Sequence, residues 1–180
     1  MKPFPKRLKL ADLPTRIEKL ERFSERTGLN VYVKRDDMSG MEWSGNKIRK
    51  LEFSIQEALD RGADTLITCG GIQSNHCRAT AAAAARLGLR SCLLLRTDDP
   101  DPLLDGNYFI DKVLGADIRF ISAEDYRSRR GEVMEELAGE FERQGHKAYI
   151  IPEGASNGIG TFGYLSCMQE ILQQEKEMGV

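Results

Sequence analysis

The middle of the chain alternates short apolar runs with longer amphipathic stretches. Runs typical of strands occupy 65–69, 91–95, 117–121 and 147–151. Stretches with helical character lie between them, near 74–87, 105–114 and 124–143. Alternation at this period is typical of consecutive βαβ units. The pattern therefore predicts an α/β fold with an open parallel sheet, flanking helices and right-handed crossovers.

Glycines punctuate this alternation at nearly regular intervals. Gly62, Gly88, Gly115 and Gly145 follow the helical stretches at spacings of 26, 27 and 30 residues. A glycine ends a helix readily because it adopts the left-handed conformation at little cost. We therefore expect each of these glycines to terminate a helix just before the next strand.

The segments that flank this module suggest a second packing unit. We expect a helix over 14–27, a short strand within 30–37, a turn-rich segment over 38–46, a helix over 47–60, a loop over 152–160 and a final helix over 161–177. The final helix carries an apolar stripe of Phe162, Leu165, Met168, Ile171 and Leu172, which needs a partner. We divide the chain into 1–51, the start of a larger domain; 52–160, a small βα domain; and 161–180, the first helix of the returning larger domain.

Composition narrows the class of protein. The 180 residues carry 26 Lys and Arg against 28 Asp and Glu, and 41% are hydrophobic, which excludes disorder as the main state. The near-neutral charge argues against a nucleic-acid binder. The apolar stretches are too short for a membrane span or a signal peptide, so we expect a cytoplasmic protein with no membrane partner. Four cysteines without tight spacing predict buried thiols rather than a metal site.

Lys47 is the first candidate for chemistry. It lies in the first turn of the helix over 47–60, near the edge of the apolar face that Ile48, Leu51 and Ile55 form, whereas Arg49, Lys50 and Glu52 point elsewhere on the helical wheel. Partial burial, the helix dipole and nearby positive charge all lower the pKa of a lysine at such a position, which suits a nucleophile or a base. The alternative is a surface lysine whose amine stays in water.

The second candidate is the segment from Thr68 to Gly88. A strand ends in Gly70 and Gly71, and a helix opens at Ser74 or Asn75. Backbone N–H groups of Ser74, Asn75 and His76 at that helix start could bind a carboxylate or phosphate at the carboxyl end of a strand. Alternatively, Ser74 or Asn75 only caps the helix, and the His76 ring is a structural histidine.

The loop over 154–160 is a third, competing motif. Its glycine spacing is similar to the cofactor loop of short-chain dehydrogenases. Such a loop normally opens a dinucleotide-binding domain and is followed by a second strand and an acidic residue. Here the loop comes late in the sequence, no strand is predicted after it and no Tyr-x-x-x-Lys follows, which disfavours a nicotinamide cofactor.

Taken together, three blocks carry a family resemblance. KRDDMSGMEWSGNKIRKLEF, GGIQSNHCRATA and PEGASNGIGTFGY resemble the D-cysteine desulfhydrase and 1-aminocyclopropane-1-carboxylate (ACC) deaminase family from about Leu10 to the last residue. These are pyridoxal 5'-phosphate enzymes with the tryptophan synthase β-like fold. The resemblance implies a lyase of amino acid metabolism that acts on a small amino acid, usually as a homodimer.

The resemblance also implies roles at matching positions. Lys47 matches the lysine that forms the Schiff base with the cofactor and moves the substrate's α-proton. Asn75 matches the asparagine that hydrogen-bonds the cofactor's ring hydroxyl oxygen, and Ser74 matches a serine that contacts the substrate and takes part in proton transfer. The N–H groups from Ser74 to His76 would hold the substrate carboxylate.

Members of the family continue for about as long again, and that part carries their glycine-rich phosphate loop. We find no Gly-x-Gly-Gly-Thr-like run in these 180 residues. We therefore expect either a fragment of a longer product or a truncated relative with an incomplete second domain. The sequence GIQSNHCRATA favours D-cysteine desulfhydrase as the activity, with ACC deaminase or a catalytically inactive chain as alternatives.

Overall fold

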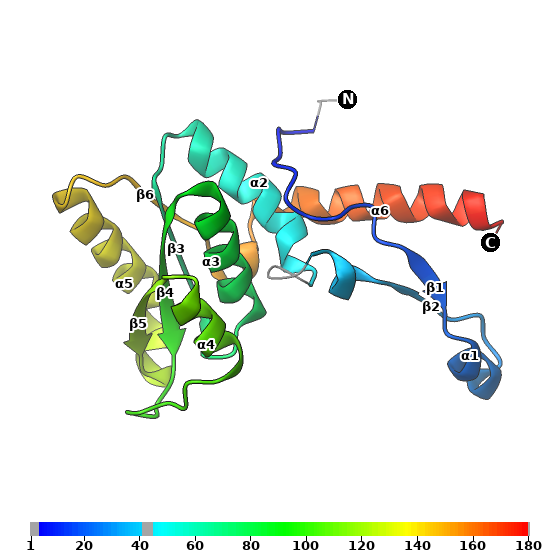
Figure 1. The fold of residues 1–180 in the computed structure, drawn as a ribbon, viewed down its shortest axis with the longest axis horizontal. Helices are drawn as coiled ribbons and strands as arrows, with labels where there is room; N and C mark the ends of the chain where they lie inside the picture. Colours follow the sequence, from blue (N-terminus) through cyan, green and yellow to red (C-terminus); the bar gives the residue numbers. More distant parts are fainter. Residues whose placement is uncertain (1–3, 41–44, 180) are drawn as a thin grey trace.

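Four parallel strands form the central sheet in the computed structural model of this chain, which describes residues 4–40 and 45–179 (Figure 1). Their order is β5–β4–β3–β6, and every neighbouring pair is parallel. The elements run β1 (Ile17–Lys19), α1 (Glu21–Thr27), β2 (Tyr32–Lys34), the 3-10 helix η1 (Asp36–Met38), α2 (Lys47–Asp60), β3 (Thr65–Gly71), α3 (Asn75–Leu87), β4 (Arg90–Arg96), α4 (Gly106–Val113), β5 (Asp117–Ile121), α5 (Ala123–Arg143), β6 (Ala148–Ile150), η2 (Glu153–Ala155) and α6 (Gly158–Met178). The predicted α/β class with a parallel sheet is confirmed.

Helices cover both faces of the sheet, which explains the continuous apolar character of its strands. Successive side chains of a strand point to opposite faces. Ile67 of β3 packs in a cluster with Tyr126 and Leu137 of α5. Its neighbour Leu66 packs instead in a cluster with Ala79 of α3 and residues of α2. Each strand must therefore be apolar on both sides, as is usual for a parallel sheet.

The four regularly spaced glycines lie where helices end. Gly62, Gly88, Gly115 and Gly145 all have positive φ, between 69° and 85°. Each lies just beyond the end of a helix, and a strand begins within a few residues of it. The periodic glycine signal thus located the four strands and the helices between them correctly.

The prediction of one helix over 14–27 was wrong. Residues 17–19 form β1, which pairs antiparallel with β2, and only α1 is helical in this stretch. The backbone N–H of Leu20 donates to the carbonyl of Val31 at 2.8 Å, which continues this pairing beyond the strands. Pairing with a segment about fifteen residues away therefore overrides the local helical pattern.

The N-terminal half of α6 packs against α2, and the rest of α6 extends beyond it (Figure 1). Phe162, from the predicted apolar stripe, takes part in this contact, with its ring centroid 6.0 Å from that of Phe53 on α2. A Cβ atom on Gly163 would lie 2.4 Å from the carbonyl oxygen of Arg49, so the two backbones are in direct contact there. Phe162 does contact the N-terminal segment, with its ring centroid 5.4 Å from that of Phe4. Leu165, Met168 and Leu172 are exposed. The helix also begins at Gly158, earlier than predicted.

The cysteines behave as predicted from their spacing. Cys69, Cys77, Cys92 and Cys167 are all free and buried. Burial raises the pKa of the Cys77 and Cys92 thiols to about 12, so both stay protonated at neutral pH. Among the described helices, none combines the length and apolarity needed to cross a bilayer.

Candidate functional site

Lys47 opens α2 and lies beside the loop that follows β6. Its side chain is half-buried rather than free in solvent. A Cβ atom on Gly154 would lie 3.6 Å from the Lys47 Nζ, and Gly154 has a φ of +63°, which a residue with a side chain rarely adopts. Glycine at this position therefore leaves room for the amine and allows the turn that brings the loop close to it.

The Lys47 side chain faces a cleft of about 620 Å³. The other residues that line the cleft come from the first half of α5 and from the 152–156 loop: Arg127, Ser128, Arg130, Gly131, Met134, Pro152, Glu153, Gly154 and Ser156. A cavity of this volume accommodates a cofactor-sized molecule. Ser74, Asn75 and His76 are not among its lining residues, so the predicted site residues do not all share this cleft.

Ser74, Asn75 and His76 lie together at the start of α3, immediately after β3. Ser74 is the N-cap residue, and its Oγ accepts a hydrogen bond from the backbone N–H of Cys77 at 3.2 Å. The capping role weighed from the sequence is therefore present. The first turn of a helix offers its backbone N–H groups no acceptor within the helix, so those of Asn75 and His76 are available to an anion.

The His76 ring is buried at this helix start, within range of the charge of Lys47. Its Nε2 lies 2.9 Å from the Thr68 Oγ1 on β3. Burial, followed by the positive charges of Lys47 and Lys50, lowers the pKa of His76 to about 3. The imidazole is therefore neutral at physiological pH, as expected for a structural histidine, and the two lysines are close enough for their charges to affect it.

Lys50 is a second buried amine near Lys47. Its Nζ donates to the Ser156 Oγ at 2.9 Å, and burial together with the charge of Lys47 lowers the pKa of Lys50. The helical wheel placed Lys50 away from the apolar face of α2, and the structure shows that this other side of the helix is buried as well. The 152–156 loop and α6 cover that side of the helix, so α2 is enclosed almost all round.

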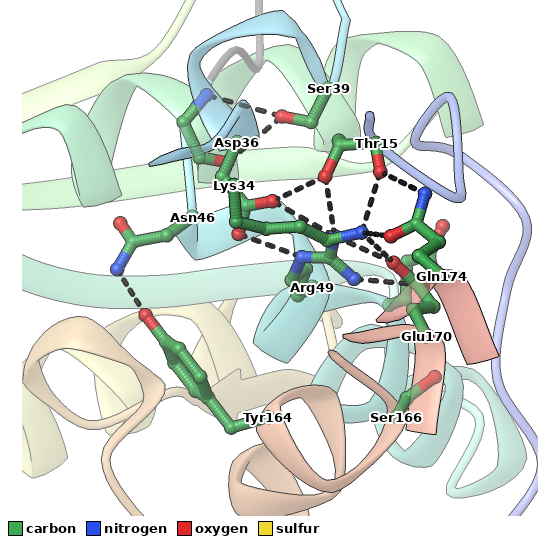
Figure 2. A network of polar contacts seen from close by, with 12 residues as sticks. Thr15, Lys34, Asp36, Ser39, Asn46, Arg49, Tyr164, Ser166, Glu170 and Gln174 are labelled. Carbon is green, nitrogen blue, oxygen red and sulfur yellow. Dashed lines mark hydrogen bonds and ion pairs between the residues drawn. The ribbon is translucent and has the colours of Figure 1, made fainter. Parts of the chain in front are cut away.

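Arg49 is likewise buried, although the wheel placed it on the same polar side (Figure 2). Its guanidinium donates to both carboxylate oxygens of Asp36 at 2.8 Å and to both of Glu170 at 2.9 Å. It also donates to the Thr15 Oγ1 at 3.0 Å. Burial acts to lower the pKa of Arg49, but the hydrogen bonds and negative charges of Asp36 and Glu170 outweigh it and raise the pKa. The carboxylates of Asp36 and Glu170 thus surround the guanidinium of Arg49, whose positive charge was expected from the sequence to act on Lys47.

The Arg49 network connects three segments that are distant in sequence. Lys34 of β2 forms an ion pair with Glu170 at 3.1 Å, and the Gln174 Nε2 donates to the Thr15 carbonyl at 2.9 Å. Asn46, just before Lys47, contacts the Tyr164 hydroxyl of α6 (Figure 2). Together these contacts fix the first turn of α2, and hence Lys47, against α6 and the N-terminal segment.

Sequence reasoning missed the roles of Arg49, Asp36 and Glu170. It also missed Glu52, whose Oε1 accepts from the backbone N–H groups of Leu10 and Ala11 at 2.7 and 2.9 Å. Burial raises the pKa of Glu52, against the effect of these hydrogen bonds. The sequence signal that could have indicated these buried ion pairs is the high density of charged residues in the block KIRKLE.

The expected turn over 38–46 falls partly on 41–44, outside the described residues.

Comparison with known proteins gives one consistent family. Residues 8–179 match the family model described as pyridoxal-phosphate dependent enzyme. The chain is 47% identical, over 97% of its length, to the bifunctional D-cysteine desulfhydrase/1-aminocyclopropane-1-carboxylate deaminase, mitochondrial, of Arabidopsis thaliana. It is 41% identical, over 98% of its length, to the D-cysteine desulfhydrase of Serratia proteamaculans.

Solved structures agree on the fold. A crystal structure of an ACC deaminase homologue superposes with a TM-score of 0.87 at 42% identity, covering 95% of this chain and 51% of that one. A fungal L-serine ammonia-lyase from Rhizomucor miehei has a TM-score of 0.68 at 15% identity over 90% of this chain and 47% of that one, and shows the shared fold alone. The chain covers 45% of the Arabidopsis protein and 54% of the Serratia protein, about half the length of these relatives.

Proposed function

This chain belongs to the pyridoxal-phosphate dependent enzymes, and from that premise we propose that it supplies the lysine-bearing half of a lyase site for a small amino acid. The observation that carries the proposal is the position of Lys47: a half-buried amine, beside Gly154, on a cofactor-sized cleft. Pyridoxal phosphate, when bound, supplies an aldehyde that an amine can hold and a ring that stabilises negative charge at the substrate's Cα.

Lys47 and the 152–156 loop supply the cleft for such a group, whereas the roles of Ser74 and Asn75, which lie outside the lining of that cleft, rest on the family resemblance. The Lys47 Nζ would hold the aldehyde carbon and, once released by the incoming amino acid, would take up the proton from Cα. The Asn75 amide would donate to the ring hydroxyl oxygen. The N–H groups at the start of α3 would bind the substrate carboxylate, and Ser74 would lie beside it.

For the substrate we propose D-cysteine, which loses its β-substituent as hydrogen sulfide and then takes up one water molecule to give pyruvate and ammonia. The alternative is ACC, whose ring opens and which takes up one water molecule to give 2-oxobutanoate and ammonia. Both activities appear in the name of the Arabidopsis relative, and the first in that of the Serratia relative. A chain of this family that performs neither reaction is the remaining alternative.

We also propose an oligomeric state and a cellular location. The family resemblance supports a homodimer, and the four free cysteines support a reducing, cytoplasmic location. The division of the chain at residues 51 and 160 stays a prediction. We propose no nucleic-acid or membrane partner and no resident metal.

Reductive trapping tests the role of Lys47. The chain is incubated with pyridoxal phosphate, reduced with borohydride, digested and analysed by mass spectrometry. We expect the phosphopyridoxyl label on Lys47, its loss from that peptide in Lys47→Arg, and its retention on Lys47 in Lys50→Arg. A label spread over exposed lysines, and no weaker in Lys47→Arg, would contradict the proposal.

Product analysis then separates the substrates. Sulfide and pyruvate from D-cysteine would support the first reading, and 2-oxobutanoate from ACC would support the second. A chain that carries the label on Lys47 but releases none of these products would support the inactive alternative. L-cysteine serves as the stereochemical control.

A further inference from the structure

Asn107, in the first turn of α4, holds the segment in which Asn75 lies. Its Nδ2 donates to the backbone carbonyl of Gln73 at 2.8 Å and to the Oδ1 of Asn75 at 3.0 Å. Its backbone N–H donates to the Oε1 of Gln73 at 2.8 Å. Asn107 thus contacts residues 73 and 75, on either side of Ser74, from more than thirty positions further along the chain.

These contacts determine which way the Asn75 amide faces. A backbone carbonyl can only accept, so the group that Asn107 presents to Gln73 must be its NH₂. The same NH₂ has one proton left, and the atom of Asn75 that receives it must be the oxygen. The Asn75 Nδ2 is therefore turned away from Asn107, with its two donor protons available to another molecule.

The orientation of the Gln73 side-chain amide is determined in the same way. The backbone N–H of Asn107 can only donate, which assigns the facing atom of Gln73 as Oε1. The Nε2 then donates to the Oδ1 of Asp105, the N-cap residue of α4, at 2.8 Å. A Cβ atom on Gly106 would lie 2.5 Å from the Gln73 Oε1, so only glycine permits this approach. The amide orientations form one consistent set.

Exposure explains why such a restraint matters. In this chain the side chains of Gln73 and Asn75 are exposed to solvent and Asn107 is half-buried. An exposed asparagine amide otherwise rotates between orientations that present either its oxygen or its nitrogen. Because Asn107 holds the Asn75 oxygen in place, the Asn75 amide already has the donor orientation before a ligand binds. Binding then loses less conformational entropy.

We propose that Asn107 is a positioning residue for the site: it fixes the Asn75 amide so that its N–H groups, and not its oxygen, face the cofactor's ring hydroxyl oxygen. This inference rests on the proposed function for the identity of the acceptor, whereas the amide orientation follows from the contacts alone. Asn107 acts through Asn75 and touches no reacting atom.

The orientation is testable without any cofactor. In side-chain amide NMR of the free chain, we expect the Asn107 NH₂ protons to exchange slowly with water and the Asn75 amide to be rigid. In Asn107→Ala the Asn75 amide should become mobile, while backbone exchange within α3 is unchanged. The matched control, Asn30→Ala, alters an exposed asparagine far along the chain and should leave Asn75 rigid. An Asn75 amide equally mobile in the wild type and in Asn107→Ala would overturn the proposal.

The functional consequence is testable with pyridoxal phosphate bound. We expect Asn107→Ala to weaken binding about five- to tenfold, the usual effect of losing one well-oriented hydrogen bond. Because a donated hydrogen bond favours the deprotonated ring oxygen, the pH midpoint of the bound cofactor's absorbance should move upward. Asn107→Asp, which replaces the donor with an acceptor of the same shape, should weaken binding further.

A double-mutant cycle shows whether Asn107 acts through Asn75. In an Asn75→Ala background, Asn107→Ala should change neither the affinity nor the pH midpoint. An effect of equal size in that background would overturn the positioning role and indicate a general structural one. A wild-type chain that binds no pyridoxal phosphate would overturn the proposed function, and the cofactor-facing part of this inference with it. The NMR result would still decide the amide orientation.

Discussion

The Glu170 carboxylate on α6 accepts two hydrogen bonds, each 2.9 Å long, from the Arg49 guanidinium on α2 (Figure 2). The Arg49 side chain is 1% exposed, and Asp36 occupies the other side of its guanidinium. Arg49 lies two residues after Lys47, so this pair joins the final helix to the turn that presents the candidate catalytic amine.

Removing one partner of this buried pair should destabilise the chain strongly. We expect Glu170→Ala to lower the free energy of unfolding by about 3 kcal/mol, because the buried arginine then lacks half of its compensating charge. Urea unfolding measures the change. The control, Glu132→Ala, removes an exposed carboxylate that pairs with Arg129 and should cost about 0.5 kcal/mol. Equal effects of the two variants would contradict a structural role for the pair.

The contact between the backbones of α2 and α6 should reject even one methyl group. Gly163→Ala would place Cβ 2.4 Å from the Arg49 carbonyl oxygen, so we expect a loss of at least about 1–3 kcal/mol of stability. Gly131→Ala is the matched control, since Gly131 is also helical and nothing lies within 4 Å of its added Cβ. It should stabilise the chain by about 0.5–1 kcal/mol. A neutral Gly163→Ala variant would show that the helices separate easily.

Asp111 is a buried carboxylate on α4 whose ionisation opposes folding. Burial raises its pKa from 3.8 to about 7, although Arg78 acts to lower it. Between these pH values the folded chain keeps a proton that the unfolded chain has lost, so stability falls as the pH rises. Asp111→Asn should therefore stabilise the chain above pH 7 and much less below pH 4, as measured by unfolding across this range. Asp101→Asn, at an exposed position, should show no such dependence.

His76 gives the opposite pH dependence. Its pKa falls from 6.5 to about 3 on folding, so the unfolded chain binds a proton that the folded chain does not. Stability is then complete above pH 6.5 and is lost as the pH falls toward 3, by about 1.4 kcal/mol per pH unit. The test uses the Asp111→Asn background, because the two trends offset each other. His76→Gln should flatten the slope, whereas Asn30→Ala, which changes an exposed side chain that does not titrate, should leave it unchanged.

Local sequence was enough to predict the repeating part of the fold. The four strands of the sheet and the ends of the helices between them depend on short apolar runs and on glycines that adopt positive φ, and both act within a few residues. The same holds for the start of α3, where Ser74 caps the helix as its residue type suggests. The position of Lys47 at the start of α2 was also predictable from helical periodicity.

The remainder depended on contacts between segments far apart in the chain. Residues 17–19 form a strand because β2 pairs with them. An analysis of local helical periodicity does not include that distant partner. Arg49 and Lys50 lie on the polar side of α2, yet α6 and the 152–156 loop cover that side and bury them. Burial of a charge depends on which segments pack over it and which opposite charges they bring, so only the tertiary structure could reveal these contacts. The orientation of Asn75 by Asn107 is of the same kind.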